Sequence, residues 1–255
     1  MKITFLGTGT SQGVPVIACD CPVCRSLDFK NKRTRSSIHI QTQGLSLIID
    51  IGPDFRQQVL REGINHLDAI LLTHEHKDHT AGLDEVRSFN FKQKKDMPVY
   101  GRSSVLCQLR SEYEYIFGEQ KYPGVPSVAL EEISNQPFSI NGQEIIPVEV
   151  LHYKLPVFGF RLNDFVYITD AKQISEKEMT KLENADILVL NALQKTPHIS
   201  HFTLDEALAL IEQVQPRQAY LTHISHYLGL AQEVEESLPD NVSLAYDGLT
   251  VQSGA

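Results

Sequence analysis

Residues 73–79 place three histidines and an aspartate close together in the chain, and side chains of these types can bind metal ions. The segment reads Thr-His-Glu-His-Lys-Asp-His and directly follows the apolar run of residues 69–72. Neutral imidazole nitrogens and carboxylate oxygens are ligands that zinc, manganese and iron accept. Alternate residues of a strand point to the same side, so the His-x-His pair can present two ligands to one ion, and the Asp-His pair can face a second. The candidate ligands here are His74, His76, Asp78 and His79.

Three further polar residues come directly after apolar runs that we predict to be strands. They are His152, Asp170 and His223. Functional side chains often lie in loops that a rigid scaffold positions. Any one of the three could be an ordinary hydrogen-bonded residue, but their shared position at the end of a strand favours a common site.

The bulk composition sets limits on the kind of protein. The chain has 255 residues, of which 42% are apolar, and a formal net charge of −9. This is enough apolar material for one layered domain, which we expect to span residues 1–255. The acidic balance argues against long nucleic acid as a partner, so we expect a small substrate. No apolar run approaches the length of a membrane span and the N-terminus has no signal-peptide layout, so we expect a cytoplasmic protein with no membrane partner.

The four cysteines suit a reducing compartment. Three of them, Cys19, Cys21 and Cys24, lie within six residues. Residues this close together can hold a metal between them more readily than they can form disulfides. We expect the fourth, Cys107, to be a small buried apolar residue.

The predicted elements mix strands and helices along the whole chain. Strands are predicted at residues 3–7, 38–42, 46–51, 68–73, 144–150, 157–161, 165–169, 187–191 and 218–221. Helices are predicted at residues 54–61, 103–116, 175–182, 203–214 and about 230–237. The helix after Thr203 has the clearest start, because Thr203 and Glu206 form a capping-box pattern. Two successive sets of such elements favour stacked β-sheets covered by helices.

With these residues in order, the chain resembles the metallo-β-lactamase superfamily along nearly its whole length. The resemblance rests on the His-x-His-x-Asp-His pattern and on the three strand-end residues that follow it. It implies an α/β fold, specifically a four-layer αββα sandwich, with two zinc or manganese ions along the edge where the two sheets meet. By this resemblance His74, His76 and His152 would hold one ion, Asp78, His79 and His223 the other, and Asp170 would bridge the two.

Such a pair of cations would make a hydroxide available near neutral pH and would hold the oxygens of an in-line displacement. Asp50, at the end of the apolar run of residues 47–49, resembles the acidic residue that orients a ligand histidine in this family. The alternative is a strand-end aspartate that starts a turn or caps the next helix.

The cysteines give a narrower resemblance. Cys19-x-Cys21-x-x-Cys24, in a loop of about residues 19–26, is similar to the extra zinc site of the PhnP phosphodiesterases of the carbon–phosphorus lyase pathway. That resemblance implies that His226 is the fourth ligand of a Cys₃His zinc site. Such a site would be structural, because four protein ligands leave no position for a substrate. His223 and His226 would then bind different metals, and the structural zinc would brace the loop that carries a catalytic ligand. Free thiols are the alternative.

A second motif points to the reaction. The His-x-Thr pattern of His201 and Thr203 resembles the motif of the ribonuclease Z and PhnP phosphodiesterase group, in which the histidine lies near the scissile phosphate. His201 could protonate the leaving alkoxide or donate a hydrogen bond to a phosphoryl oxygen. We therefore expect His201 to act in catalysis together with the ligand Asp78. His198 is nearby, but only His201 lies two residues before the capping threonine.

These features favour a metal-dependent phosphodiesterase that hydrolyses a small phosphodiester, cyclic forms included, with a metal-bridging hydroxide. The resemblance points to phosphoribosyl cyclic phosphate or a 2′,3′-cyclic nucleotide as substrate, and a homodimer would match the group. The chain lacks an evident long arm of the sort that relatives use to hold tRNA, which argues against a tRNA substrate.

Two alternatives stay open. The cysteine pattern also resembles the PqqB protein of pyrroloquinoline quinone biosynthesis, which would imply iron-dependent oxidation or a binding role in that pathway. The same metal centre could otherwise cleave a lactone, thioester or β-lactam, although His201 disfavours carbonyl hydrolysis.

Overall fold

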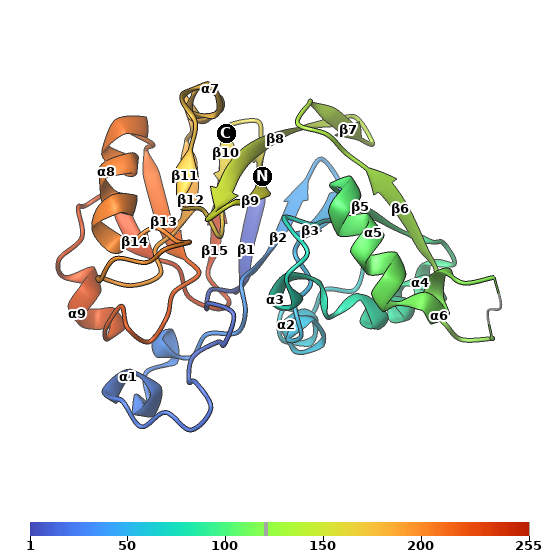
Figure 1. Ribbon diagram of the computed structural model, residues 1–255, viewed down its shortest axis with the longest axis horizontal. Coiled ribbons are helices and arrows are strands. Elements are labelled where there is room, and N and C mark those ends of the chain that lie inside the picture. The colour runs from blue at the N-terminus through green and yellow to red at the C-terminus, as the bar shows by residue number, and fades with distance from the viewer. Residues whose placement is uncertain (120–121, 255) are drawn as a thin grey trace.

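Two β-sheets lie face to face and helices cover their outer faces (Figure 1). The computed structural model describes residues 1–119 and 122–254. The first sheet has seven strands in the order β15-β1-β2-β3-β4-β5-β6. Their bounds are β15 (Thr250–Gln252), β1 (Lys2–Gly7), β2 (Ser37–Thr42), β3 (Leu45–Ile49), β4 (Ala69–Leu71), β5 (Met97–Gly101) and β6 (Val128–Glu132).

The second sheet has eight strands, seven of them in the order β11-β8-β9-β10-β12-β13-β14, with β7 paired to β8. Their bounds are β7 (Phe138–Ile140), β8 (Gln143–His152), β9 (Leu155–Leu162), β10 (Phe165–Tyr167), β11 (Gln173–Ile174), β12 (Ile187–Asn191), β13 (Gln218–Thr222) and β14 (Val242–Leu244). Strands β10, β12, β13 and β14 run parallel, so their carboxyl ends meet at one edge.

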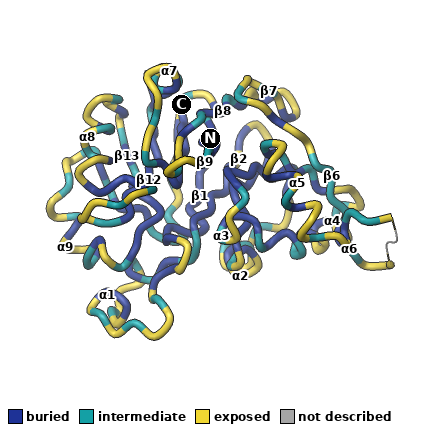
Figure 2. The backbone as a smooth tube through the Cα atoms, viewed as in Figure 1, coloured by how far each residue is buried: buried dark blue, intermediate teal, exposed yellow. Residues whose placement is uncertain are grey.

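The helices divide between the two outer faces. Helices α2 (Phe55–Arg61), α3 (Lys77–Thr80), α4 (Arg87–Gln93), α5 (Ser103–Glu112) and α6 (Glu114–Phe117) lie beside the first sheet, and α7 (Glu176–Met179), α8 (Leu204–Val214) and α9 (Ala231–Glu235) lie beside the second (Figure 1). Helix α1 (Pro22–Arg25) projects away from both sheets, within a loop that Figure 2 shows as largely exposed. Short 3₁₀ helices η1 (Phe29–Asn31), η2 (Leu83–Val86) and η3 (Thr180–Leu182) complete the set.

Three apolar clusters show why the chain folds in four layers. The alternation of β3 sends Leu47 and Ile49 into a cluster between the sheets, where Phe160 and Val189 of the second sheet join them. Ile48, between them, belongs instead to the cluster under α2 and α5. A third cluster packs α8 and α9 on the second sheet. These layers confirm the predicted αββα sandwich.

The predicted elements agree with most of this architecture. The helix predicted from Thr203 begins at Leu204, and the Thr203–Glu206 capping box is present. The helix predicted over residues 103–116 is broken at Tyr113, whose φ of −111° and ψ of 47° are not helical. The expectation for Cys107 was wrong: Val105, Leu106 and Leu109 form the buried face of α5, whereas Cys107 is exposed. None of the described helices is long and apolar enough to cross a membrane.

Candidate metal centre

The candidate ligands come together because their strands end at neighbouring places. His74 and His76 follow β4, Asp78 and His79 lie on α3, and His152 ends β8. Asp170 and His223 follow the parallel strands β10 and β13. Asp50, Asp170 and His223 each have φ between 55° and 63°, the left-handed region that non-glycine residues rarely adopt. Strain of this kind often lies at functional sites, and here it occurs where the chain turns sharply after a strand.

Four of the candidates form one tight cluster. A ligand atom from each of Asp78, His79, Asp170 and His223 lies within 4.8 Å of the others. His79 Nε2 is 3.0 Å from an Asp78 carboxylate oxygen and 3.3 Å from one of Asp170. His223 Nε2 is 3.0 Å from the other Asp170 oxygen. This is the set that the family resemblance implies for one ion, together with the bridging carboxylate.

Two histidine nitrogens of this cluster lack hydrogen-bond partners, as expected of atoms that bind a cation. His79 Nε2 and His223 Nε2 are buried, and neither forms a hydrogen bond with a described residue despite the short distances to carboxylate oxygens. A buried polar atom without a partner costs about 1–3 kcal/mol, so such atoms call for an explanation. A metal ion between nitrogen lone pairs and carboxylate oxygens would satisfy both.

The other predicted set lies beside it. His74 Nε2 is 3.0 Å from His76 Nδ1, and the His76 and His152 rings are 5.3 Å apart between centroids. His152, Asp170 and His201 also place one ligand atom each within 4.8 Å of one another. The structure therefore brings His201 directly against the candidate ligands His152 and Asp170. Which of these side chains hold ions stays a prediction.

Asp50 holds His79 from the side away from the cluster. Its carboxylate is fully buried and accepts from His79 Nδ1 at 2.6 Å, from the Thr73 backbone N–H at 2.9 Å and from the Thr73 hydroxyl. With Nδ1 engaged in this way, His79 presents Nε2 to the cluster. Asp50 caps no helix, because α2 begins at Phe55 after Asp54.

Burial and charge shift several pKa values here in opposite directions. Burial raises the pKa of Asp50, although His79 opposes that rise. Burial disfavours the charge on His79, but Asp50, Asp170 and Asp78 outweigh it and raise its pKa well above the usual value. Burial lowers the pKa of His223 to about 4, so this ring is neutral and its lone pair is free to bind a metal.

The three clustered cysteines meet His226. One donor atom each from Cys19, Cys21, Cys24 and His226 lies within 4.8 Å of the others. His226 Nδ1 is 3.2, 3.4 and 3.5 Å from the three sulfurs, in that order. The backbone N–H of Cys24 donates to the Cys21 sulfur, which lowers the pKa of Cys21 to about 6, whereas burial raises that of Cys24 to about 11. Three sulfurs and one imidazole are the donor set of a closed zinc site.

The segment after β13 connects the two clusters. It carries His223 and, three residues later, His226, and Ile224 between them is hydrogen-bonded to the turn of residues 8–10 that follows β1. Ile224 donates from its N–H to the Thr8 carbonyl at 2.9 Å and accepts from Thr10 at 3.1 Å. A displaced His226 would therefore pull on the backbone that positions His223.

We expect Cys24→Ser to remove one zinc per chain and to weaken metal binding at the neighbouring centre about 10-fold, because groups that orient a ligand typically contribute 10–100-fold to affinity. Metal content after dialysis, and the metal concentration that gives half-maximal activity, measure the two effects. Cys107→Ser is the matched control, since Cys107 is exposed on α5. An unchanged metal requirement in Cys24→Ser would show that the two sites are independent.

Two neighbours of His201 were not recognised as site residues in the sequence. Ser200 Oγ lies 3.0 Å and His198 Nδ1 lies 3.2 Å from His201 Nδ1. Their position just before His201 was the only available signal, because neither belongs to a ligand pattern.

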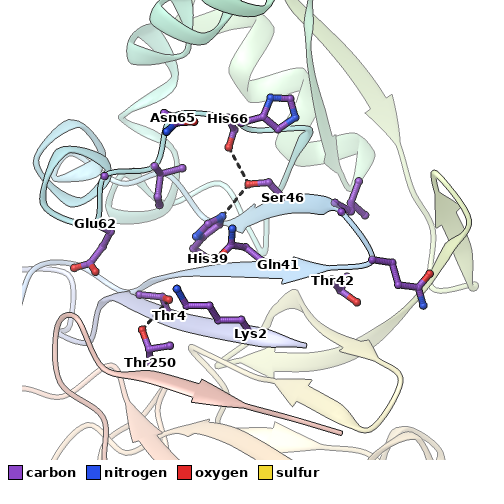
Figure 3. A pocket seen from close by; sticks show the side chains of 15 residues that line it. Lys2, Thr4, His39, Gln41, Thr42, Ser46, Glu62, Asn65, His66 and Thr250 are labelled. Carbon is purple, nitrogen blue, oxygen red and sulfur yellow. Dashed lines mark hydrogen bonds between the residues drawn. The ribbon is translucent and has the colours of Figure 1, made fainter. Parts of the chain in front are cut away.

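A separate cavity of about 610 Å³ opens on the outer face of the first sheet (Figure 3). His39 Nε2 lies 2.8 Å from Ser46 Oγ, which donates to the His66 carbonyl oxygen at 2.9 Å. The serine proton is thus engaged with a carbonyl, so this pair is not arranged as a nucleophile and base. None of the candidate ligands lines the cavity.

Comparisons with known proteins agree with this geometry. The family described as "Beta-lactamase superfamily domain" matches residues 46–224. The octanoyltransferase of Porphyromonas gingivalis is 40% identical over 252 residues, which cover 98% of this chain and 51% of that protein. The chain thus spans about half the length of this curated relative.

Two solved structures are similar over nearly the whole chain. A diphosphatase from the PhnP family is 38% identical with a TM-score of 0.93, and the match covers 99% of this chain and 98% of that one. Zinc-bound PqqB from Methylobacterium extorquens has a TM-score of 0.82 at 19% identity, covering 99% and 100%, which indicates a shared fold alone. The chain therefore belongs to the β-lactamase superfamily and has the metallo-β-lactamase fold of the PhnP-family diphosphatase.

Proposed function

We propose that this enzyme hydrolyses a small phosphodiester, with a 2′,3′-cyclic nucleotide or phosphoribosyl cyclic phosphate as the substrate type. The observation that carries the proposal is the position of His201. Its Nε2 lies 3.1 Å from Asp170, and its ring stacks on His223 at 4.9 Å between centroids. A protonated nitrogen beside the metal-binding carboxylate can meet the leaving oxygen of a phosphate ester.

Two ions would be held by these side chains, one by Asp78, His79 and His223 and the other by His74, His76 and His152, with Asp170 close to both sets. Zinc or manganese suits these nitrogen and oxygen donors. When bound, the ions would supply a hydroxide near neutral pH and would neutralise the phosphoryl oxygens.

The chain itself supplies the proton. Hydrolysis adds a water-derived oxygen to phosphorus and breaks the bond to the leaving alkoxide, which must gain a proton to leave as an alcohol. His201 Nε2 can give that proton and recover one from water afterwards. The backbone on either side of His201 is held in place, because Phe202 donates to the Ala171 carbonyl at 2.8 Å and Thr203 caps α8.

The similar proteins support hydrolysis at phosphorus and suggest a second candidate substrate. The similar PhnP-family protein is a diphosphatase, so a diphosphate diester such as ADP-ribose is the second candidate substrate. The octanoyltransferase is about twice as long as this chain, so its named activity need not reside in the matching half. The thiol-rich zinc loop suits a reducing compartment, so we place the enzyme in the cytoplasm.

We expect bis-p-nitrophenyl phosphate to be hydrolysed in the presence of zinc or manganese, and His76→Ala to abolish turnover. No turnover by fully metallated protein would contradict the proposal. In that case bound iron with oxygen uptake would favour PqqB-like oxidation, and cleavage of a lactone or thioester would favour carbonyl hydrolysis.

His201→Ala tests the proton donor. We expect kcat for 2′,3′-cyclic AMP to fall about 100-fold, the lower end of what general acid catalysis contributes. The loss on bis-p-nitrophenyl phosphate should be much smaller, because nitrophenolate leaves without a proton. Steady-state kinetics on both substrates measure the difference, and equal losses on both would rule out the general-acid role.

A further inference from the structure

We infer that Ser200 is a positioning residue that holds the His201 ring with Nε2–H directed into the site. This inference rests on the proposed role of His201 as proton donor. Ser200 lies directly before His201, and its hydroxyl oxygen is 3.0 Å from His201 Nδ1. Its backbone carbonyl accepts a hydrogen bond from His152 Nδ1 at 2.9 Å. One residue thus contacts both a candidate ligand and the candidate acid.

The hydrogen-bond partner of His201 Nε2 determines whether Nδ1 requires a donor or an acceptor. Nε2 lies 3.1 Å from an Asp170 carboxylate oxygen, and an ionised carboxylate can only accept. Nε2 must therefore carry a proton in this arrangement. In the neutral ring Nδ1 is then an acceptor and requires a donor, and in the charged ring Nδ1 carries a proton and requires an acceptor.

A hydroxyl can meet either requirement. Ser200 Oγ donates to Nδ1 of the neutral ring, and the same oxygen accepts from Nδ1–H of the charged ring. The charged ring is the acid. When it gives its Nε2 proton to the leaving oxygen, Nδ1 keeps its proton and continues to donate to Ser200 Oγ, so the contact survives the transfer and the ring keeps its orientation. Second contacts of this kind fix the tautomer and direction of functional histidines.

His198 is the competing partner of His201, with Nδ1 3.2 Å from His201 Nδ1. The backbone N–H of Ser200 points at the same His198 nitrogen at 3.3 Å. A nitrogen that accepts from a backbone N–H cannot also donate, so His198 cannot supply the proton that the neutral His201 ring needs at Nδ1. The serine hydroxyl can supply it, and its oxygen lies nearer to His201 Nδ1, at 3.0 Å, than to His198 Nδ1, at 3.3 Å.

A substitution can remove the hydroxyl contact of Ser200 with His201 and keep its carbonyl contact with His152. Ser200→Ala removes the hydroxyl but keeps the carbonyl that accepts from His152, so metal content should stay at the wild-type level. We expect kcat for 2′,3′-cyclic AMP to fall about 10-fold, as is typical when an orienting contact is lost. The rate on bis-p-nitrophenyl phosphate should change less than about 2-fold, and Ser200→Thr should restore the first rate because it keeps the hydroxyl.

A second readout needs no turnover. The ¹⁵N chemical shifts of the His201 ring, assigned by their loss in His201→Ala, report which nitrogen carries the proton. We expect one dominant Nε2–H form in wild type and Ser200→Thr, and a mixture of tautomers in Ser200→Ala. Ser139→Ala, an exposed serine of β7, is the matched control.

Unchanged ring shifts together with unchanged rates in Ser200→Ala would overturn the inference, as would equal losses on both substrates or a larger effect from His198→Ala. If the proposed function were wrong, the wild-type protein would hydrolyse neither phosphodiester. The ¹⁵N shifts of the His201 ring would still show whether Ser200 orients that ring.

Discussion

Asp170→Asn should lower kcat for bis-p-nitrophenyl phosphate by about three orders of magnitude, the largest effect we expect from any single substitution. Metal ions contribute several kcal/mol to such reactions, and each 1.36 kcal/mol is tenfold in rate. Asp170 lies within 3.3 Å of His79, His201 and His223 at once, so its carboxylate belongs both to the cluster with Asp78, His79 and His223 and to the cluster with His152 and His201. The asparagine keeps the size of the side chain but loses one charged oxygen, so it cannot bridge two cations.

Metal content and kinetics should be measured together. We expect Asp170→Asn to retain fewer than two ions at the centre while the Cys₃His site keeps its zinc. Asp240→Asn, an exposed aspartate before β14, is the matched control and should behave as wild type. Full occupancy and wild-type turnover in Asp170→Asn would rule out a bridging role.

The sheets could be predicted from the sequence mainly where apolar runs are long. Strand β12 was predicted with its observed bounds, Ile187–Asn191, because all five of its residues are buried and it lies inside a parallel sheet. Strands β14 and β15, of three residues each, are too short to show a period. Strand β5 escaped prediction because Pro98 and Gly101 interrupt its pattern.

The candidate ligands could be found in the sequence because His-x-His-x-Asp-His and Cys-x-Cys-x-x-Cys are local patterns. The structure brings these residues together, and their binding of metal stays a prediction. Asp50 could be suspected only from its place after a strand, and its contact with His79 depends on two segments 29 residues apart meeting. The Ser200 contact depends on the rotamers of two adjacent side chains, which no sequence pattern encodes.

The loop after β3 packs closely on the backbone of α3 at Gly52. A Cβ built on Gly52 would lie 2.0 Å from the Asp78 carbonyl oxygen, closer than any real contact. This close approach is part of a backbone pairing in which Ile51 donates to the His79 carbonyl at 2.8 Å and accepts from Gly82 at 2.7 Å. Glycine at position 52 thus lets the loop after β3 pack directly on the helix that carries two candidate ligands.

Gly52→Ala should therefore lower the free energy of unfolding by about 3 kcal/mol, the upper end of the usual cost of overpacking, because the obstacle is backbone and cannot rotate away. It should also weaken metal binding, since relief of the clash requires Asp78 and His79 to move. Denaturant unfolding of the metal-free protein measures the first effect and metal titration the second. Gly101→Ala is the matched control: its added Cβ would meet the flexible end of Leu106 at 3.3 Å, and its cost should be far smaller. Equal stabilities for the two variants would show that the loop can yield without disturbing the ligands.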